Sequence, residues 1–326
     1  METIGGSHFH GTRLLVSTPT LPSDFAEAFT VPTTGGLELR VYRLLKVPDE
    51  AVPALIFAHA NGFNAGCYQP FLSRLSAHFR VFAYDARGHG NSSRPLDNLE
   101  HDYAMVRFAE DLSAITARVR RMIGPDSGLH FASHSLGGLG AVLMEAELDE
   151  APFDSLTLFE PPIYPPDDHP ERAAALMHVP IFIRWAAGRR GIFPDRQALR
   201  AEMDNIITYR RFAPEMMEAY VAAAVEAGPD GGLVLRCPGV IESAIYGNCP
   251  YSGIFEQTAV VRTRARIYGT DQSVLPELHS WAPGTMASIA ANMTQAEART
   301  MPGCLHLMVQ EDPAACAAAV ADHALD

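Results

Sequence analysis

The sequence predicts a doubly wound α/β fold, with a mostly parallel sheet and an inserted helical cap. Short apolar runs alternate with segments of helical spacing along most of the chain. Continuous apolar runs are typical of strands that are buried on both faces of a parallel sheet. The alternation stops between Pro161 and about Thr258, where the sequence contains no clear buried strand. Because this segment is too long for a loop, we expect it to fold as a helical cap.

The expected elements follow in order along the chain. The segment Gly36–Leu45 alternates apolar and polar residues, as in a half-buried antiparallel strand, whereas Val52–Ala58 is mostly apolar. Further apolar runs predict strands at Arg80–Tyr84, Leu129–Ala132, Leu156–Phe159 and Arg264–Tyr268. Helical spacing predicts helices at Pro70–His78, Tyr103–Ile123, Gly138–Leu148, Arg196–Ile207, Pro214–Ala227 and the alanine-rich Gln310–Ala324. We therefore expect a core of residues 1–160 and 259–326 and a cap of residues 161–258.

The motif Ser133-His134-Ser135-Leu136-Gly137 lies between a predicted strand and a predicted helix, where it reads as a nucleophile elbow. The turn is so tight that the residues two before and two after the serine must be small, as Ser133 and Gly137 are. Such a turn would lift Ser135 Oγ above the sheet edge and leave the Leu136 N–H free to bind an oxyanion. Taken alone, a chance turn would show the same pattern, so the rest of the chain decides the interpretation.

Composition excludes several classes of function. The net charge of -13 argues against nucleic acid as a partner, because phosphate binding needs a basic surface. The sequence has no run of about 18 apolar residues, so it predicts no membrane span. The segment Met1–Pro19 lacks signal-peptide features, and we therefore expect a cytoplasmic location. Lys46 is the single lysine, which disfavours Schiff-base or Ser-Lys chemistry. The five scattered cysteines predict reduced thiols, and no pattern predicts a metal or another cofactor.

Four landmarks occur in a characteristic order: His59–Phe63, Asp85–Ser92, the Ser135 elbow, and Cys304–His306 before the last helix. In this combination the chain resembles the α/β-hydrolase superfamily over roughly residues 35–325. The HANGF and FEPP segments and the LRCP sequence of the cap also resemble, more loosely, bacterial and fungal serine hydrolases that include peroxisomal-lipase-like proteins.

The resemblance implies a nucleophile, a base and an acid. Ser135 is the expected nucleophile, and a serine hydroxyl needs a base within hydrogen-bond reach. His306 lies in the loop where the superfamily carries that base. Two acids remain open, Asp271 after the strand Arg264–Tyr268 and Glu160 at the end of Leu156–Phe159. We favour Glu160, because a partly buried carboxylate needs a charged or hydrogen-bonding partner such as the imidazole; Asp271 could instead form a turn or cap a helix.

The second oxyanion donor is expected from the loop after the strand Val52–Ala58. Ala60 replaces a glycine that superfamily members carry there, so Asn61 aligns with the donor position, and the Phe63 N–H is an alternative. Phe63 and His134 are further expected beside the substrate, with His134 serving either for packing or as pocket wall.

We therefore expect a serine hydrolase that acts on a small-molecule carboxylic ester, lactone or thioester. A serine at the elbow, where an aspartate would indicate a haloalkane dehalogenase or an epoxide hydrolase, favours acyl transfer to water. The alternatives are a non-catalytic ligand-binding protein on the same fold, or a cofactor-free perhydrolase or haloperoxidase activity. The sequence leaves the oligomeric state open.

Overall fold

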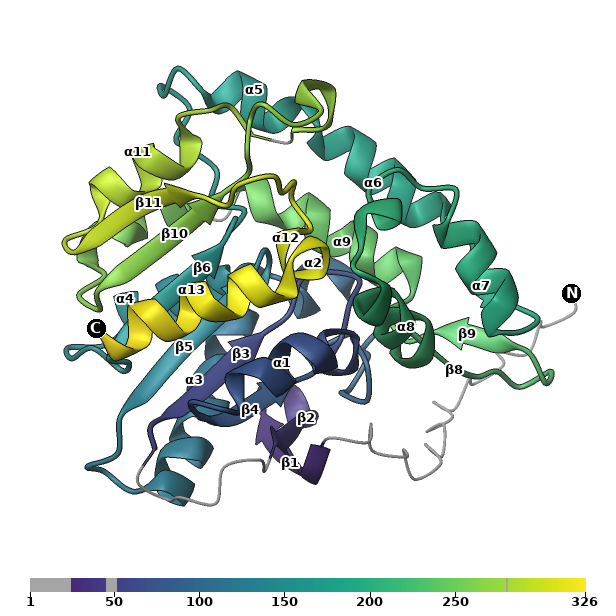
Figure 1. The fold of residues 1–326 in the computed structure, drawn as a ribbon, viewed down its shortest axis with the longest axis horizontal. Helices are drawn as coiled ribbons and strands as arrows, with labels where there is room; N and C mark the ends of the chain where they lie inside the picture. The colour runs from purple at the N-terminus through teal and green to yellow at the C-terminus, as the bar shows by residue number, and fades with distance from the viewer. Residues whose placement is uncertain (1–24, 45–51, 252, 280) are drawn as a thin grey trace, which may run out of the picture.

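The computed structural model describes residues 25–44, 52–251, 253–279 and 281–326. Within these ranges the chain forms an eight-stranded sheet in the order β1-β2-β4-β3-β5-β6-β10-β11 (Figure 1). The strands β4, β3, β5, β6, β10 and β11 pair in parallel, and β1 and β2 add an antiparallel edge. The predicted fold class is confirmed. Lys46, the residue after the predicted strand Gly36–Leu45, lies outside the described residues.

The predicted core strands occur within a few residues of their expected ends. The observed strands are β1 Phe25–Thr33, β2 Leu37–Leu44, β3 Ala54–Ala58, β4 Arg80–Tyr84, β5 Leu129–His134, β6 Ser155–Phe159, β10 Ala265–Gly269 and β11 Ala296–Thr300. Sequence reasoning missed β1 and β11. Both strands lie at the sheet edges, and most residues of β11 are exposed, so their apolar pattern is weak.

Helices cover both faces of the sheet. The helices of the core are α1 Gln69–Leu75, α2 Leu99–Asp102, α3 Met105–Ile123, α4 Gly137–Ala146, α11 Thr285–Asn292, α12 Met308–Glu311 and α13 Pro313–Leu325. The short helix α10 Ile254–Gln257 falls at the end of the predicted cap segment but contacts α4 of the core. Helices α1 and α13 contact each other on one face, and α3 packs against α4 on the other (Figure 1). A separate apolar core fills each side of the sheet. No helix in the described ranges is long and apolar enough to cross a membrane.

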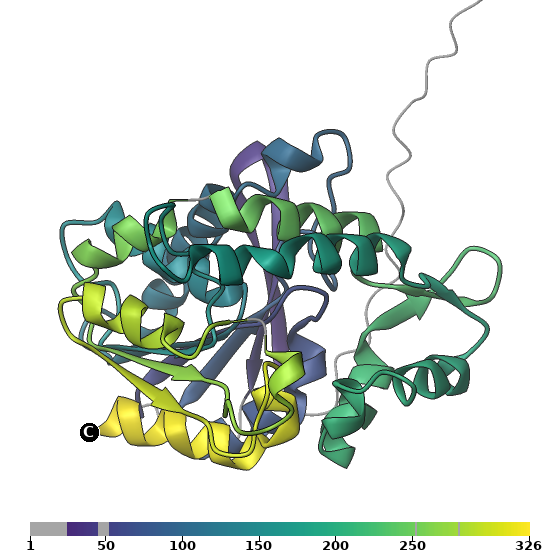
Figure 2. The ribbon, with the colours of Figure 1, turned by 90° about the horizontal axis from the view of Figure 1, so that it is seen from above.

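The segment that we expect to form the cap, residues 161–258, contains helices α5 Arg172–Met177, α6 Val179–Gly188, α7 Arg196–Met203, α8 Pro214–Ala223 and α9 Gly239–Asn248 in addition to α10. Figure 2 shows α6 and α9 side by side, and the two helices contact each other extensively.

The cap is not wholly helical, which corrects one expectation. It also holds a small antiparallel sheet of β7 Ile192–Phe193, β9 Leu233–Leu235 and β8 Val225–Ala227, in that order. The helix predicted to run to Ala227 ends at Ala223, because Gly228 and the following Pro-Asp-Gly-Gly turn the chain back as a hairpin.

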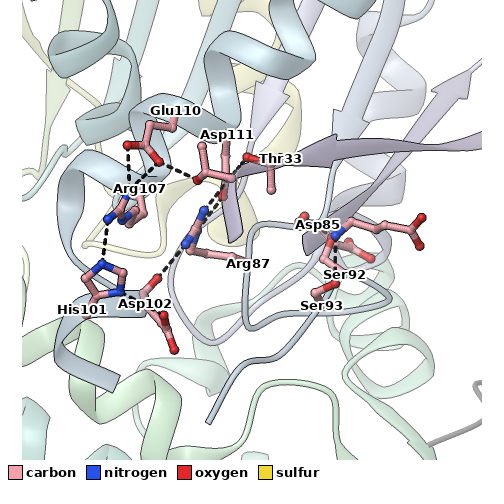
Figure 3. A network of polar contacts seen from close by, with 12 residues as sticks. Thr33, Asp85, Arg87, Ser92, Ser93, His101, Asp102, Arg107, Glu110 and Asp111 are labelled. Carbon is pink, nitrogen blue, oxygen red and sulfur yellow. Dashed lines mark hydrogen bonds and ion pairs between the residues drawn. The ribbon is translucent and has the colours of Figure 1, made fainter. Parts of the chain in front are cut away.

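A buried ion pair holds the loop that follows β4. The Arg87 guanidinium donates to both carboxylate oxygens of Asp111 on α3, each at 2.7 Å, and to the Asp102 backbone carbonyl at 2.8 Å (Figure 3). Thr33 on β1 donates to the same Asp111 carboxylate at 2.6 Å. Arg87 and Asp111 are almost fully buried, and such a bidentate pair fixes geometry strongly. The network therefore ties the Asp85–Ser92 landmark to α3 and, through Thr33, to β1.

Candidate active site

The elbow adopts the strained geometry that its sequence predicts. Ser135 has a φ of 51°, in the left-handed region that a non-glycine residue rarely adopts. Its N–H donates to the Phe159 carbonyl of β6 at 2.8 Å, which ties the turn to the neighbouring strand. A Cβ on Gly137 would lie 2.6 Å from both Ala58 Cβ and Ala58 O, so a side chain there would collide with β3. The predicted need for a small residue thus has a specific cause.

His306 and Glu160 form a direct contact. His306 lies in the loop between β11 and α12, and its Nδ1 is 2.5 Å from Glu160 Oε2. The glutamate side chain is 2% exposed, whereas that of His306 is 31% exposed and lines the cavity described below. Because a carboxylate only accepts hydrogen bonds, His306 Nδ1 carries the proton and donates it to Glu160. The other ring nitrogen, Nε2, is then left with its lone pair.

Sheet order explains why Glu160 can reach His306. Glu160 follows β6, which lies directly between β5, the strand of the elbow, and β10. The Glu160 N–H donates to Tyr268 O on β10 at 2.8 Å, and the Thr270 N–H donates to Glu160 Oε1 at 3.4 Å. Glu160 also has a positive φ, of 43°, so the backbone turns sharply at the carboxylate. The strained backbone and both hydrogen bonds hold the carboxylate at the carboxyl end of the sheet.

Asp271 makes different contacts. Its Oδ1 accepts from the Ser273 N–H and hydroxyl, at 3.1 and 2.6 Å, and its Oδ2 accepts from the Gly303 N–H at 2.9 Å. These bonds lower the pKa of the Asp271 carboxyl. Asp271 thus closes a turn and supports the loop that carries His306, and no contact of its carboxylate with the imidazole is found among the described residues.

The two expected oxyanion residues, Asn61 and Leu136, line one cavity together with Ser135 and His306. The alternative donor is occupied, because the Phe63 N–H donates to Ala60 O at 3.2 Å. The Gly62 N–H is also occupied, since it donates to His89 Nε2 at 3.1 Å. Among these loop donors, the geometry therefore favours Asn61 N–H.

His134 does not line the cavity. It is fully buried, and its Nε2 donates to the His306 carbonyl at 2.8 Å. Its Nδ1 therefore accepts from the Tyr68 hydroxyl at 2.7 Å, and that hydroxyl accepts from the Ala60 N–H at 3.2 Å. Burial lowers the pKa of His134 to about 3, which keeps the ring neutral. This chain of hydrogen bonds joins the His59–Phe63 loop, the elbow and the loop that carries His306.

Phe63 also lies away from the cavity, contrary to the expectation that it contacts substrate. Its ring is buried in an aromatic cluster with Tyr68 and with Tyr209, Phe212 and Tyr220 of the cap. Packing between core and cap accounts for its position.

The cavity is small and largely apolar, with a volume of about 60 Å³. Cap and core both contribute to its wall, and the described lining contains no Lys, Arg, Asp or Glu. The lining residues are Asn61, Ser135, Leu136, Pro162, Tyr164, Phe182, Ile245, Tyr246, Cys249, Trp281 and His306.

A family model described as "Alpha/beta hydrolase family" matches residues 55–319, which is most of the chain and includes Ser135, Glu160 and His306. The chain belongs to the alpha/beta hydrolase family. Membership in this family supports a hydrolytic enzyme.

This alpha/beta hydrolase is 31% identical over 97 residues to 3-oxoadipate enol-lactonase 1 of Acinetobacter baylyi. The aligned residues make up 28% of this chain and 31% of that protein. The aligned segment thus spans about a third of that curated relative.

Solved structures share the fold over nearly the whole chain. The structure of E-2-(acetamidomethylene)succinate hydrolase has a TM-score of 0.73 at 18% identity and covers 92% of this chain and 100% of its own. The peroxisomal alpha-beta-hydrolase Lpx1 of Saccharomyces cerevisiae has a TM-score of 0.68 at 16% identity, covering 94% and 85% of the two chains. The predicted resemblance to such peroxisomal hydrolases is confirmed at the level of fold.

Sequence reasoning missed most of the cavity wall of this hydrolase. Tyr164 follows the two prolines after Glu160, and Trp281 comes from the loop between β10 and α11. Each is an aromatic residue in a loop after a core strand, and the sequence carries no further signal that either one lines a cavity. Two aromatic residues of the cap, Tyr209 and Tyr220, do not line the cavity and pack in the aromatic cluster around Phe63.

An arginine of the cap also contacts the loop of the candidate base. Arg211 Nε lies 2.6 Å from Glu311 Oε2, and Arg211 Nη2 donates to Gly303 O at 2.7 Å. Glu311 in turn accepts from the Leu305 N–H at 3.2 Å. Desolvation raises the pKa of the Glu311 carboxyl despite its pairing with Arg211. The cap is therefore tied to the residues on both sides of Cys304.

Proposed function

We propose that this hydrolase cleaves a carboxylic ester, lactone or thioester of a small molecule through an acyl-enzyme on Ser135. One observation carries the proposal: Ser135 and His306 line the same cavity, and His306 Nδ1 lies 2.5 Å from the buried Glu160 carboxylate. In this arrangement His306 Nε2 is free to act as base. Asn61 and Leu136 on the same wall support an oxyanion site.

The proposed reaction has two balanced halves. His306 Nε2 takes the proton of the Ser135 hydroxyl while Oγ bonds to the carbonyl carbon, and the carbonyl oxygen receives the electron pair. The N–H groups of Leu136 and Asn61 stabilise this oxyanion. When the oxyanion collapses, the leaving oxygen or sulfur departs with the proton from His306 Nε2. Water then loses a proton to the same nitrogen and attacks the acyl carbonyl carbon. When this second oxyanion collapses, Ser135 Oγ departs with the proton from His306 Nε2, which releases the acid and restores both residues.

Glu160 would stabilise the imidazolium that forms in each half of the reaction. A carboxylate that is almost fully buried interacts strongly with such a charge, because little water screens the pair. The cap, residues 161–258, contributes Phe182, Ile245 and Tyr246 to the cavity wall. We infer that the cap sets the acyl-chain length that the site accepts.

Labelling of the purified protein with a fluorophosphonate tests the nucleophile. The wild-type chain should be labelled once at Ser135, whereas Ser135→Ala should not be labelled and should lose about 10⁴-fold or more in turnover of p-nitrophenyl esters. His306→Ala should be comparably slow, and the double variant should lose little more, because the two residues act as a unit. Full labelling of a folded Ser135→Ala variant would refute the proposal.

A panel of p-nitrophenyl esters of graded chain length, lactones and thioesters would then identify the bond that is cleaved. Hydrolysis of none of these compounds, together with no fluorophosphonate labelling, would favour a ligand-binding role on the same fold.

A further inference from the structure

Helix α6 exposes a row of large apolar side chains on its outer face. Met177, Ile181 and Trp185 are exposed by 63%, 50% and 37%. They are four residues apart, and the backbone stays helical from α5 through His178 into α6, so the three side chains are neighbours on one face of the helix. Single exposed apolar residues are ordinary on a protein surface, whereas a contiguous row indicates a contact surface.

The opposite face of α6 belongs to the candidate active site. Phe182 lines the cavity together with Ser135, and its ring stacks on Tyr246 of α9 at a centroid distance of 5.4 Å. Figure 1 shows α5 and α6 along the outer edge of the molecule. One side of this helix therefore contacts the cavity, while the other carries the exposed row.

The charge around the row is opposite in sign to that of the whole chain. Residues 172–194 contain four arginines and no Asp or Glu, although the net charge of the chain is -13. Arg184 lies on the same face of α6 as Ile181 and Trp185 and is exposed. Its Nε donates to Pro180 O at 3.3 Å, and no carboxylate of the described residues pairs with its guanidinium. The row thus includes an unpaired positive charge.

A hollow of about 410 Å³ lies beside the row. Its lining combines Arg184 and Trp185 with the apolar side chains of Met203 and Ile206. Arginines outnumber acids in the described lining, where Glu202 is the acidic residue. Cationic and apolar groups are therefore adjacent on this part of the surface.

A lipid surface with anionic headgroups matches both properties. Aliphatic side chains and tryptophan insert at the boundary between headgroups and acyl chains, and arginine binds phosphate. A second copy of the chain fits less well, because a two-fold contact would set the same patch against itself and bring Arg184 toward its own copy. The negative net charge is screened beyond about 8 Å at physiological ionic strength, so the local arginine dominates at contact.

We propose that the outer face of α6, formed by Met177, Ile181, Arg184 and Trp185, docks on an anionic lipid surface. The three apolar side chains insert among the lipids, and Arg184 binds the headgroup phosphates. Because Phe182 on the inner face lines the cavity, docking would leave about one helix diameter, roughly 10 Å, between lipid and cavity. The claim concerns binding and does not depend on the proposed hydrolytic activity.

Co-sedimentation of the purified full chain with lipid vesicles tests the proposal. One set of vesicles contains phosphatidylcholine alone, and the other contains equal parts of phosphatidylcholine and phosphatidylglycerol. The chain should bind the anionic vesicles more tightly, and the difference between the two sets should vanish at about 1 M salt, where the Debye length is only ~3 Å. No binding of the wild-type chain to anionic vesicles would overturn the proposal.

Two substitutions separate charge from apolar insertion. Arg184→Glu changes the charge by two units and should lower the partition coefficient on anionic vesicles roughly 25-fold, at about 5-fold per unit, with no loss on phosphatidylcholine vesicles. Trp185→Ser should lower the partition coefficient about 10-fold on anionic vesicles, because it removes apolar surface from the contact.

The matched controls are Arg121→Glu and Leu325→Ser, which make equivalent changes at exposed positions near the amino ends of core strands. Arg121 lies in the last turn of α3 before β5, and Leu325 ends α13, where the Ala324 carbonyl accepts from Arg264 just before β10. Both controls should bind vesicles as the wild type does. Equal losses in the controls and in the α6 variants would overturn the proposal.

Tryptophan fluorescence provides a readout without any substitution. The chain has two tryptophans, and Trp281 is buried, so insertion of Trp185 should move the emission to shorter wavelength when anionic vesicles are added. An unchanged emission spectrum would contradict insertion. Analytical ultracentrifugation without lipid tests the other occupant: a dimer that Trp185→Ser dissociates, together with no vesicle binding, would assign the face to a second copy and overturn the proposal.

Discussion

Replacing Glu160 with glutamine should cripple hydrolysis while leaving the fold intact. The carboxylate accepts from two donors, His306 Nδ1–H through Oε2 and Thr270 N–H through Oε1. A glutamine amide has one acceptor oxygen and one NH₂ donor, so it can satisfy only one of these partners. If the NH₂ group faces His306, the imidazole must accept at Nδ1 and carry its proton on Nε2. In that tautomer it cannot take the proton of Ser135.

The opposite orientation of the glutamine amide would restore little of the activity. The oxygen would then accept from His306, but the NH₂ group would face the Thr270 N–H, and the imidazolium would have lost its negative partner. The contact of 2.5 Å and the 2% exposure of Glu160 mean that water cannot replace the lost charge. We therefore expect turnover to fall by about 10³- to 10⁴-fold, the size of effect that loss of the orienting carboxylate has in other serine hydrolases.

The assay is kcat/KM on a p-nitrophenyl ester, with the midpoint of urea unfolding as the check on folding. Asp271→Asn is the matched control, because it makes the same chemical change at the other acid that the sequence offered. Its oxygen can still close the turn with Ser273, so we expect a loss of only a few-fold, the cost of about one hydrogen bond to Gly303. The reasoning is refuted if folded Glu160→Gln keeps activity within 10-fold of wild type, or if Asp271→Asn is the more damaging change.

Three further outcomes follow from contacts around the site. Tyr68→Phe removes the hydroxyl between the Ala60 N–H and His134, so kcat should fall about 10-fold with little change in KM, through looser placement of the reacting groups; an unchanged kcat would contradict this role. Arg189→Met should lower the free energy of unfolding by about 3–5 kcal/mol in urea titrations, because it leaves the buried Glu242 carboxylate unpaired. The double variant Arg189→Met/Glu242→Leu should recover most of that loss, and no recovery would show that the pair matters in another way. Finally, burial lowers the pKa of five histidines below the ordinary 6.5: His59, His89, His130, His134 and His323. Below pH 6.5 the unfolded chain therefore binds more protons than the folded chain, so the free energy of unfolding should decrease as pH falls from 6.5 toward 3, and these groups should contribute nothing above pH 7. A free energy of unfolding that is independent of pH between 7 and 5 would contradict this prediction.

Much of the core could be predicted because its strands are short, apolar and buried. The predicted strand Arg80–Tyr84 has the observed bounds of β4, and all five of its residues are buried. The secondary structure of the cap was harder to predict from the sequence, because its strands are two or three residues long and form only when distant segments pair. Val225–Ala227 fits a helical pattern as well as a strand, and its pairing with Leu233–Leu235 decides between them.

In the candidate site, the sequence alone predicted the features that depend only on the local backbone, above all the tight turn at Ser135. The small residues around Ser135 were predicted because the turn itself excludes larger ones, and the contact of Gly137 with Ala58 is the structural form of that rule. The order of the landmarks likewise indicated the family.

Contacts between distant segments were decided by the tertiary structure alone. Glu160 and Asp271 each follow a core strand, so the sequence offered both as the acid, and the sheet brings the end of β6 against His306 while Asp271 supports the neighbouring turn. The same holds for His134, which the sequence left open as packing or pocket wall and which links two loops in the structure. A sequence pattern records how a residue fits its own strand or turn, whereas the partner of a buried polar group depends on which strands and loops become neighbours.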